Sequence, residues 1–200
     1  MSQSPSAFSI LASALLFACS ATDAKGDPAA PSGSKFASAR SEQLKTFPSL
    51  LSPILAVPDD SRLAFHYDAI GVQIYTCRAT ASGCSWTFQA PEASLFDRRG
   101  HLVVKHYRGP TFESVDDHSQ VIAKKLQEFT AHANAIPELL LQATTHAGKG
   151  SMEDVSYIQR LNTVGGLAPS AGCDAAHVGA TARVDYKASY FFSRPQADRK

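Results

Sequence analysis

The sequence lacks an excess of charge of either sign. Its 19 lysine and arginine residues are balanced by 18 aspartate and glutamate residues, which leaves a formal net charge of +1. The basic residues are scattered rather than clustered, so the electrostatic footprint of a nucleic-acid-binding protein is missing and we expect no nucleic-acid partner. Acidic polymers and anionic membrane surfaces are equally unsupported as partners.

Long hydrophobic runs and the motifs of known cofactor sites are also scarce. After residue 20, no segment approaches the roughly 20 apolar residues of a membrane-spanning helix. The pair Gly165 and Gly166 lacks the helix context and the lysine of a phosphate-binding loop, and the chain contains no GxSxG elbow. Asp174 and His177 could chelate a metal from a turn, but two ligands do not make a site. We therefore expect neither a cofactor nor a metal.

The N-terminus, in contrast, carries a targeting signal. Residues 7–18 form an apolar run with the length of a signal-peptide core, too short for an ordinary span. Cys19 follows the triplet Leu-Phe-Ala, which resembles a bacterial lipobox, although the preceding residues carry no lysine or arginine. An ordinary cleaved signal is the alternative. We expect an exported protein, either a lipoprotein anchored in the membrane through Cys19, in the outer membrane or facing the periplasm, or a secreted protein.

Composition divides the chain into four parts. We expect a signal peptide (1–18), a lipobox cysteine with a flexible tether (19–46), a folded domain (47–193) and a polar tail (194–200). The tether is rich in Ala, Ser, Gly and Pro and almost free of large apolar residues. The overall apolar fraction of 44% and charged fraction of 18% are close to globular averages, so the central part can form one domain.

Strand patterns dominate this central part. Short alternating or β-branched runs separated by Gly and Pro occupy residues 62–67, 71–77, 85–90, 95–96, 101–107, 139–145, 155–163 and 183–192. They predict a mainly β fold, a single antiparallel β-sandwich or barrel-like domain with at most one or two short helices. Residues 119–135 are ambiguous. Ile122, Leu126 and Phe129 share a helical face, but a strand over residues 119–126 is the competing interpretation.

Export makes the remaining cysteines candidates for a disulfide. A bridge from Cys77 to Cys84 would close a hairpin, whereas one from Cys77 to Cys173 would tie an early strand to the loop before the last one. In a chain-entropy treatment, the bridge that closes the longer loop would stabilise the folded protein more. Both pairings stay open at this point, because native geometry decides which pair can form.

One group of residues suggests acid–base chemistry. His106 shares a strand face with Leu102 and Val104, and Glu113 follows seven residues later. A partly buried histidine beside a carboxylate could act as a general acid or base. A core histidine satisfied by one hydrogen bond is the structural alternative.

A second group suggests ligand binding. It consists of the polar residues Gln159, Arg160, Asn162 and Thr163. Arg160 could bind a carboxylate or phosphate with two parallel hydrogen bonds. A solvated strand face or a structural ion pair is the alternative interpretation.

Several segments together resemble one known family. They are GVQIYTC, WTFQAPEASLFD, KHYRGPTFES, AIPELLLQA, YIQRLNTVGGLAP, GCD and VDYKASYFF. Over residues 55–192 the chain resembles domain-of-unknown-function family 3455, which is exported and occurs in bacteria and fungi. The resemblance implies a compact β-rich secreted domain and no established reaction.

The resemblance also bears on single residues. The family pattern has cysteines at the positions of Cys77 and Cys173 and no regular counterpart of Cys84, which implies that Cys77 pairs with Cys173 and that Cys84 stays free. Phe112 stands where the family usually has tryptophan, which implies packing at that position. A family strand corresponds to residues 120–126, so helix and strand both stay open there. The motif positions also include His106, Glu113, Gln159, Arg160, Asn162 and Thr163.

We therefore expect an exported cell-envelope protein with a binding or structural role and a possible small-molecule or envelope ligand. One alternative is a hydrolase- or isomerase-like enzyme that uses His106 and Glu113 on a small anionic substrate held by Arg160. Another is a carrier of a small apolar ligand. An enzyme requires these side chains to converge in one pocket, whereas a scaffold scatters them or pairs them off.

Overall fold

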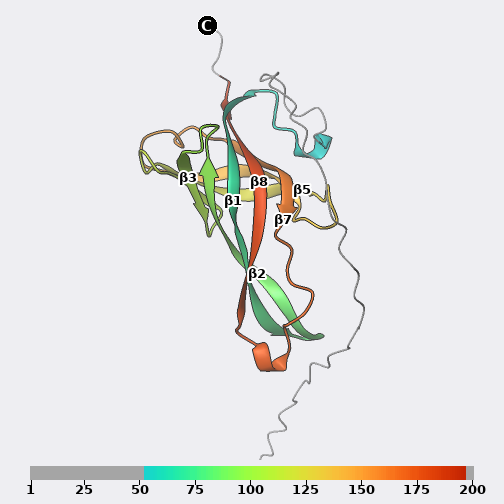
Figure 1. Ribbon diagram of the computed structural model, residues 1–200. Helices are drawn as coiled ribbons and strands as arrows, with labels where there is room; N and C mark the ends of the chain where they lie inside the picture. The colour runs from blue at the N-terminus through green and yellow to red at the C-terminus, as the bar shows by residue number, and fades with distance from the viewer. Residues whose placement is uncertain (1–51, 197–200) are drawn as a thin grey trace, which may run out of the picture.

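The protein folds as an eight-stranded antiparallel barrel (Figure 1). The computed structural model describes residues 52–196. The strands are β1 (Ser61–Thr80), β2 (Gly83–Phe96), β3 (Leu102–Tyr107), β4 (Thr111–Ser114), β5 (Gln120–Phe129), β6 (Glu138–Ala147), β7 (Tyr157–Gly165) and β8 (Thr181–Pro195). Each strand pairs with the next, and β8 closes the barrel against β1. The predicted mainly β, antiparallel, barrel-like domain is confirmed.

Helical structure within residues 52–196 is confined to two three-residue 3-10 turns, η1 (Pro53–Leu55) and η2 (Ala175–His177). No helix in this part of the chain has the length and apolar character needed to cross a membrane. Strand β8 extends to Pro195, two residues beyond the domain boundary expected at residue 193.

Strand β5 resolves the ambiguity at residues 119–135. It pairs with β4 on one side and with β6 on the other. Its alternate residues Val121 and Ala123 are buried, whereas Leu126 and Phe129 of the apparent helical stripe stay 40% and 42% exposed. Hydrogen bonding to two neighbouring strands outweighs the local helical periodicity, as expected when tertiary context competes with propensity.

The first two strands are longer than their sequence patterns indicate. β1 is one strand of 20 residues that joins the two predicted runs at 62–67 and 71–77, because β2 and β8 pair with it continuously through Gly71. β2 runs through Pro91, in a stretch that pairs with β1 but not yet with β3. An open strand edge of this kind tolerates a proline, which has no N–H to donate.

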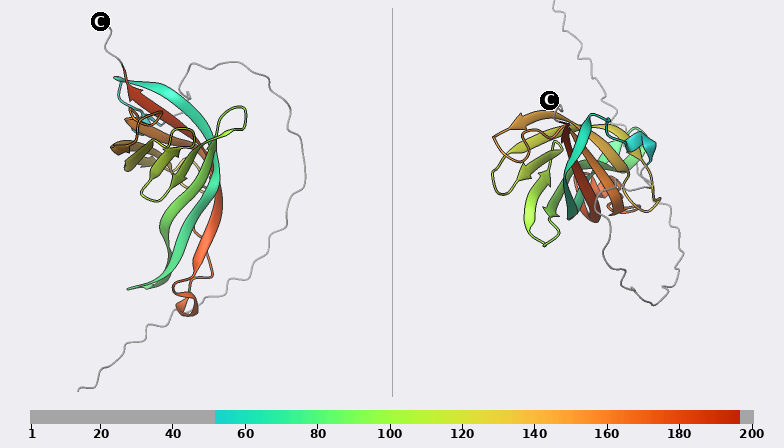
Figure 2. Two further views of the ribbon diagram at one scale, coloured as in Figure 1. Left: turned by 90° about the vertical axis from the view of Figure 1, so that its left-hand side faces the viewer. Right: turned by 90° about the horizontal axis from the view of Figure 1, so that it is seen from above.

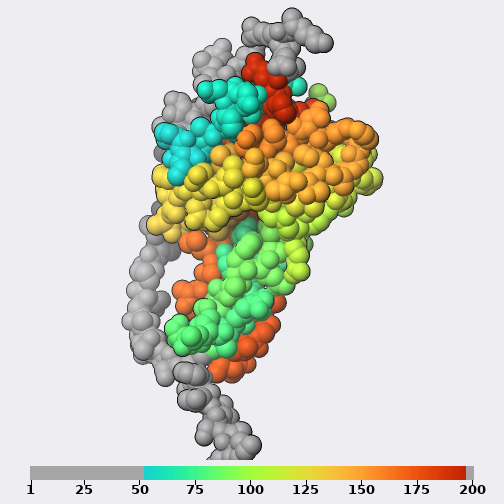
Figure 3. Space-filling view, turned by 180° about the vertical axis from the view of Figure 1, so that it is seen from behind, coloured from blue at the N-terminus to red at the C-terminus, as the bar shows by residue number. Residues whose placement is uncertain are grey.

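β1, β2 and β8 continue past the barrel as a three-stranded extension, which we call the tongue (residues 72–90 and 181–185). The last β7–β8 pair is Gly165 with Tyr186, and β3 pairs with β2 only from Ala93 onward, so the tongue has no further strands. Figure 2 shows the three strands curving away from the barrel, and Figure 3 shows the tongue as a narrow projection below a broader body.

Side chains fill the centre of the barrel. The rings of Phe112, Tyr190 and Phe192 are fully buried, and the Phe112 ring centroid lies 5.4 Å from each of the other two. The aliphatic residues around them are also buried and include Leu95, Val104, Val121 and Ile158. A smaller cluster of Leu55, Leu140 and Leu161 forms on the outer face of β6 and β7, where η1 covers the sheet.

Candidate functional site

His106 and Glu113 lie on adjacent strands but on opposite faces of the barrel wall. In the register of β3 and β4, His106 is opposite Phe112, and Glu113 is opposite Lys105. Because side chains alternate along a strand, the imidazole points into the barrel and the carboxylate points out. The structure therefore does not bring these two side chains together as an acid–base pair.

His106 is a buried residue of the barrel core. It is 3% exposed, and its ring stacks on Phe112 with the centroids 4.0 Å apart. Its Nδ1 lies 3.0 Å from the Thr111 carbonyl oxygen, which can only accept, so this nitrogen carries the hydrogen. Burial lowers the pKa of His106 to about 4, opposed by the Thr111 hydrogen bond and reinforced by the Arg160 guanidinium. The imidazole is therefore neutral at pH 7.

Glu113 is held by polar neighbours on the outer face. Its carboxylate accepts a hydrogen bond of 2.6 Å from the Tyr107 hydroxyl and one of 3.1 Å from the Gln120 amide, and His118 Nδ1 lies 3.4 Å away. The Tyr107 hydrogen bond lowers the pKa of Glu113, and the same bond raises the pKa of Tyr107 to about 12. A carboxylate stabilised in its ionised form is poorly suited to act as a general acid.

Three residues of the predicted binding group hold loops against the barrel. The Gln159 amide donates to the Leu55 carbonyl at 2.6 Å, on the outer face beneath η1. Arg160 Nη2 donates to the Pro137 carbonyl at 2.8 Å, and the Thr163 hydroxyl donates to the Ile136 carbonyl at 2.6 Å. All three side chains are buried. Gln159 and Thr163 each use a donor on η1 or on the β5–β6 connection, and Arg160 uses one Nη2 donor there, while its buried Nε has no partner.

Asn162 lies apart from Arg160 because β7 is irregular at this point. The register between β7 and β8 shifts between Leu161 and Val164, and Asn162 has a φ of 53°. Asparagine is among the residues that adopt this left-handed conformation most readily. The Asn162 backbone N–H donates to the Glu138 carboxylate at 2.7 Å, and its side chain is exposed.

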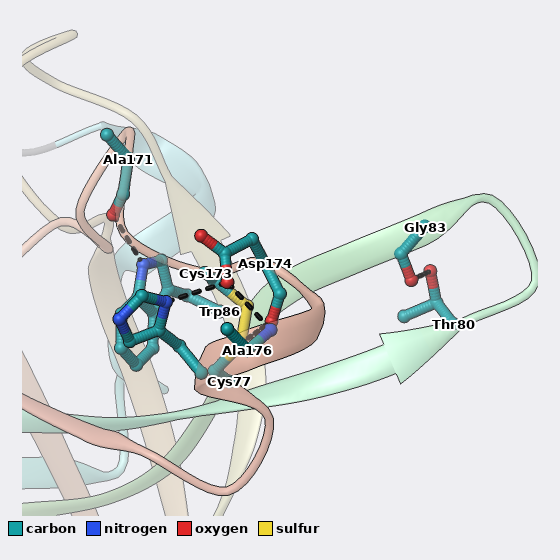
Figure 4. Close-up of a disulfide and its surroundings, with 9 residues drawn as sticks. Cys77, Thr80, Gly83, Trp86, Ala171, Cys173, Asp174 and Ala176 are labelled. Atoms are coloured by element: carbon teal, nitrogen blue, oxygen red, sulfur yellow. Dashed lines mark hydrogen bonds and ion pairs between the residues drawn. A yellow bond between two sulfur atoms is a disulfide. The ribbon is translucent and has the colours of Figure 1, made fainter. Parts of the chain in front are cut away.

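Cys77 and Cys173 form a disulfide on the tongue, as the resemblance implied (Figure 4). The Trp86 indole donates to the Ala171 carbonyl at 2.9 Å beside this bond. Together these contacts fasten the segment 166–180 to the tongue. No cysteine among residues 52–196 is a free thiol, so the expectation of a free Cys84 is wrong.

Asp174 caps the short turn η2 beside the disulfide. Its carboxylate accepts from the Ala176 backbone N–H at 2.9 Å and lies 2.7 Å from His177 Nδ1. Both contacts are local, which accounts for the spacing of Asp174 and His177 in the sequence. The described part of the chain contains no group of three or more His, Cys, Asp or Glu residues placed to hold a metal.

A pocket of about 500 Å³ is lined by residues from the start of β1, the end of β8 and the β6–β7 hairpin. The start of β1 and the end of β8 lie at the end of the barrel opposite to the tongue (Figure 1). Here the start of β1 and the end of β8 meet the β6–β7 hairpin (Figure 3). Its polar lining residues are Arg62, Gln142, His146, Asp154, Ser156, Tyr157 and Arg194. No residue of the two groups suggested by the sequence lines it. The pocket combines separate segments of the chain, so no local motif could reveal it.

Comparison with known proteins identifies the family. Residues 58–194 match the family described as "Protein of unknown function (DUF3455)". Because the match covers more than half of the chain, the protein belongs to this family. Neither the curated proteins nor the solved structures gave a match.

Proposed function

We propose that this member of the DUF3455 family is an exported cell-envelope protein that acts by binding, with the barrel as its scaffold. The observation that carries the proposal is the way the candidate residues are used. Arg160 and Thr163 donate to loop carbonyls, while His106 and Glu113 lie on opposite faces of the wall. A catalytic site needs such groups to converge on one substrate position.

Export has separate support from the disulfide. A bond such as Cys77–Cys173 forms and persists in oxidising compartments outside the cytosol. The signal peptide at residues 1–18 and lipid attachment at Cys19 lie outside the described residues and rest on the sequence. On this proposal the protein is either anchored in the membrane through Cys19 or secreted.

The alternatives gain less support. An enzyme that uses His106 would have to reach a neutral imidazole that is 3% exposed and stacked in the core. A carrier of an apolar ligand would need room inside the barrel, where Phe112, Tyr190 and Phe192 are in contact.

Native mass spectrometry tests the binding role. The protein would be released from its own cell envelope under mild conditions and weighed intact. We expect a recurrent mass increment that disappears on denaturation. Repeated recovery of bare protein would contradict the proposal.

The location can be tested independently. Cell fractionation of the wild type and Cys19→Ser, with labelled palmitate, distinguishes the two routes. If the wild type carries label and associates with membranes, and Cys19→Ser loses both, the result supports anchoring. Release of the wild type without label supports secretion. A cytosolic wild-type protein would contradict export.

A further inference from the structure

We propose that the pocket at the end of the barrel binds the oxyanion group, a carboxylate or a phosphate, of a small molecule. We call it the arginine pocket and define it by residues 62, 142, 146, 154, 156, 157 and 194. The inference rests on the proposed binding function and supplies its site and ligand class.

The two arginines of the pocket lie opposite each other, and neither makes an ion pair within residues 52–196. Arg62 and Arg194 are direct partners in the β1–β8 register, so their side chains leave the sheet on the same face. Like charges directly opposite one another destabilise a strand pair. Among residues 52–196, no ion pair joins either guanidinium to a carboxylate. A bound anion would remove this repulsion.

Arg194 is held in place and still has a donor to spare. Its Nη2 donates to the Ser151 carbonyl at 2.5 Å, and its Cζ lies 4.8 Å from the centroid of the Phe65 ring. Its Nε is buried and has no hydrogen-bond partner. Buried polar groups are normally satisfied, so contacts within the protein leave part of the hydrogen-bonding capacity of this guanidinium unused. Arg194 lines the pocket, and its planar guanidinium suits a carboxylate or phosphate oxygen bound there.

The remaining wall limits the kind of ligand. His146 Nε2 lies 2.8 Å from the Val155 carbonyl and therefore donates to it, which fixes the imidazole ring. Gln142, Ser156 and Tyr157 add neutral polar groups. Asp154 is the acidic lining residue and disfavours a polyanion. The volume of about 500 Å³ is that of a small-molecule site. These features favour a small ligand with a single oxyanion group.

Isothermal titration calorimetry of the full mature chain tests the site. The probes are methyl phosphate and acetate, with methanol as the neutral control, all at constant ionic strength because salt screens exposed charges. We expect saturable binding of at least one anion and none of methanol. Arg62→Gln should weaken the anion at least tenfold. The matched control Arg99→Gln, an exposed arginine in the β2–β3 turn, should stay within twofold of the wild type.

Two results would overturn the inference: no saturable anion binding by the wild type, or equal affinity in Arg62→Gln. Arg62 makes no ion pair or side-chain hydrogen bond within the described residues, so the variant should fold normally, which thermal unfolding without anion checks. The inference and the proposed function fail separately. A neutral molecule recovered with native protein would contradict the anion assignment and leave the binding role in place. Bare native protein would contradict the binding role whatever the calorimetry shows.

Discussion

His106 and Phe112 stack face to face across β3 and β4, with ring centroids 4.0 Å apart and planes 7° from parallel. This contact places a titratable ring in the most aromatic part of the core, where Tyr190 meets both rings edge-on. It also explains why a large aromatic residue is suitable at position 112. The histidine is part of the packing, and its charge state should be visible in stability.

Stability should fall in mild acid because of His106. Its pKa is about 4 in the folded protein and 6.5 as the unperturbed value. Between these values the unfolded chain binds more protons, so the free energy of unfolding falls as pH drops from 6.5 toward 4. We expect a loss of about 3 kcal/mol from this group. Urea unfolding at intervals from pH 7 to pH 4 measures it.

The variant His106→Asn keeps a side-chain donor but does not titrate in this range, so it should flatten the pH profile. The control is His101→Asn, which replaces an exposed histidine beside Asp97 in the β2–β3 turn. This variant should not flatten the pH profile. An unchanged slope in His106→Asn would contradict the prediction.

Loss of the Cys77–Cys173 disulfide should destabilise the protein substantially. The bond joins residues 96 apart in the sequence. In the chain-entropy treatment a loop of this length contributes about 4 to 5 kcal/mol. The double variant Cys77→Ser, Cys173→Ser should lose about this amount in urea unfolding and become sensitive to proteolysis within residues 166–180.

Trp86→Phe provides the comparison for the disulfide. It removes the hydrogen bond to the Ala171 carbonyl but leaves the disulfide, and should cost about 1 kcal/mol. Equal losses of stability in Trp86→Phe and in the double cysteine variant would mean that the disulfide is not the main contact stabilising this region.

Gly71→Ala should disturb the pairing of β1 with β2. An added Cβ would overlap the Glu92 carbonyl oxygen and Ala93, which are backbone or short side-chain atoms that cannot move aside. Overpacking of this kind typically costs about 1 to 3 kcal/mol, and we expect the upper end. Thermal or urea unfolding measures the loss.

Gly100→Ala separates this steric effect from backbone strain. Gly100 has a φ of +82° and no atom within 4 Å of an added Cβ. Its replacement should cost about 1 kcal/mol through conformation alone. A Gly71→Ala protein as stable as the wild type would show that β1 and β2 can separate there without cost.

Gln159→Leu should loosen η1. The variant deprives the Leu55 carbonyl of its donor in a buried position, which typically costs about 1 to 3 kcal/mol. The Gln159 Oε1 has no partner in the folded protein, and its removal offsets part of that loss. We expect about 1 kcal/mol net, together with faster amide hydrogen exchange at Leu55 and Ala56. Gln127→Leu, on the exposed half of β5, should leave this exchange unchanged.

Local pattern was sufficient for the class of fold but not for its details. Alternating residues around Leu63 and Leu102 predicted strands, and Gly and Pro marked several turns. The length of β1 and the strand at residues 120–129 depended on partners supplied by distant strands. The face of each β7 residue was also beyond reach, because the irregularity at Asn162 interrupts simple alternation.

For the candidate site, too, the sequence determines one part and the tertiary structure the other. The sequence by itself determined which side chains could carry chemistry, since His106, Glu113 and Arg160 have titratable or charged groups wherever they lie. Only the tertiary structure decided what those groups face: a phenylalanine ring, a tyrosine hydroxyl and a loop carbonyl. It alone brought Arg62 and Arg194 together, because closure of the barrel pairs its first and last strands, and charges so distant in sequence meet only through that pairing.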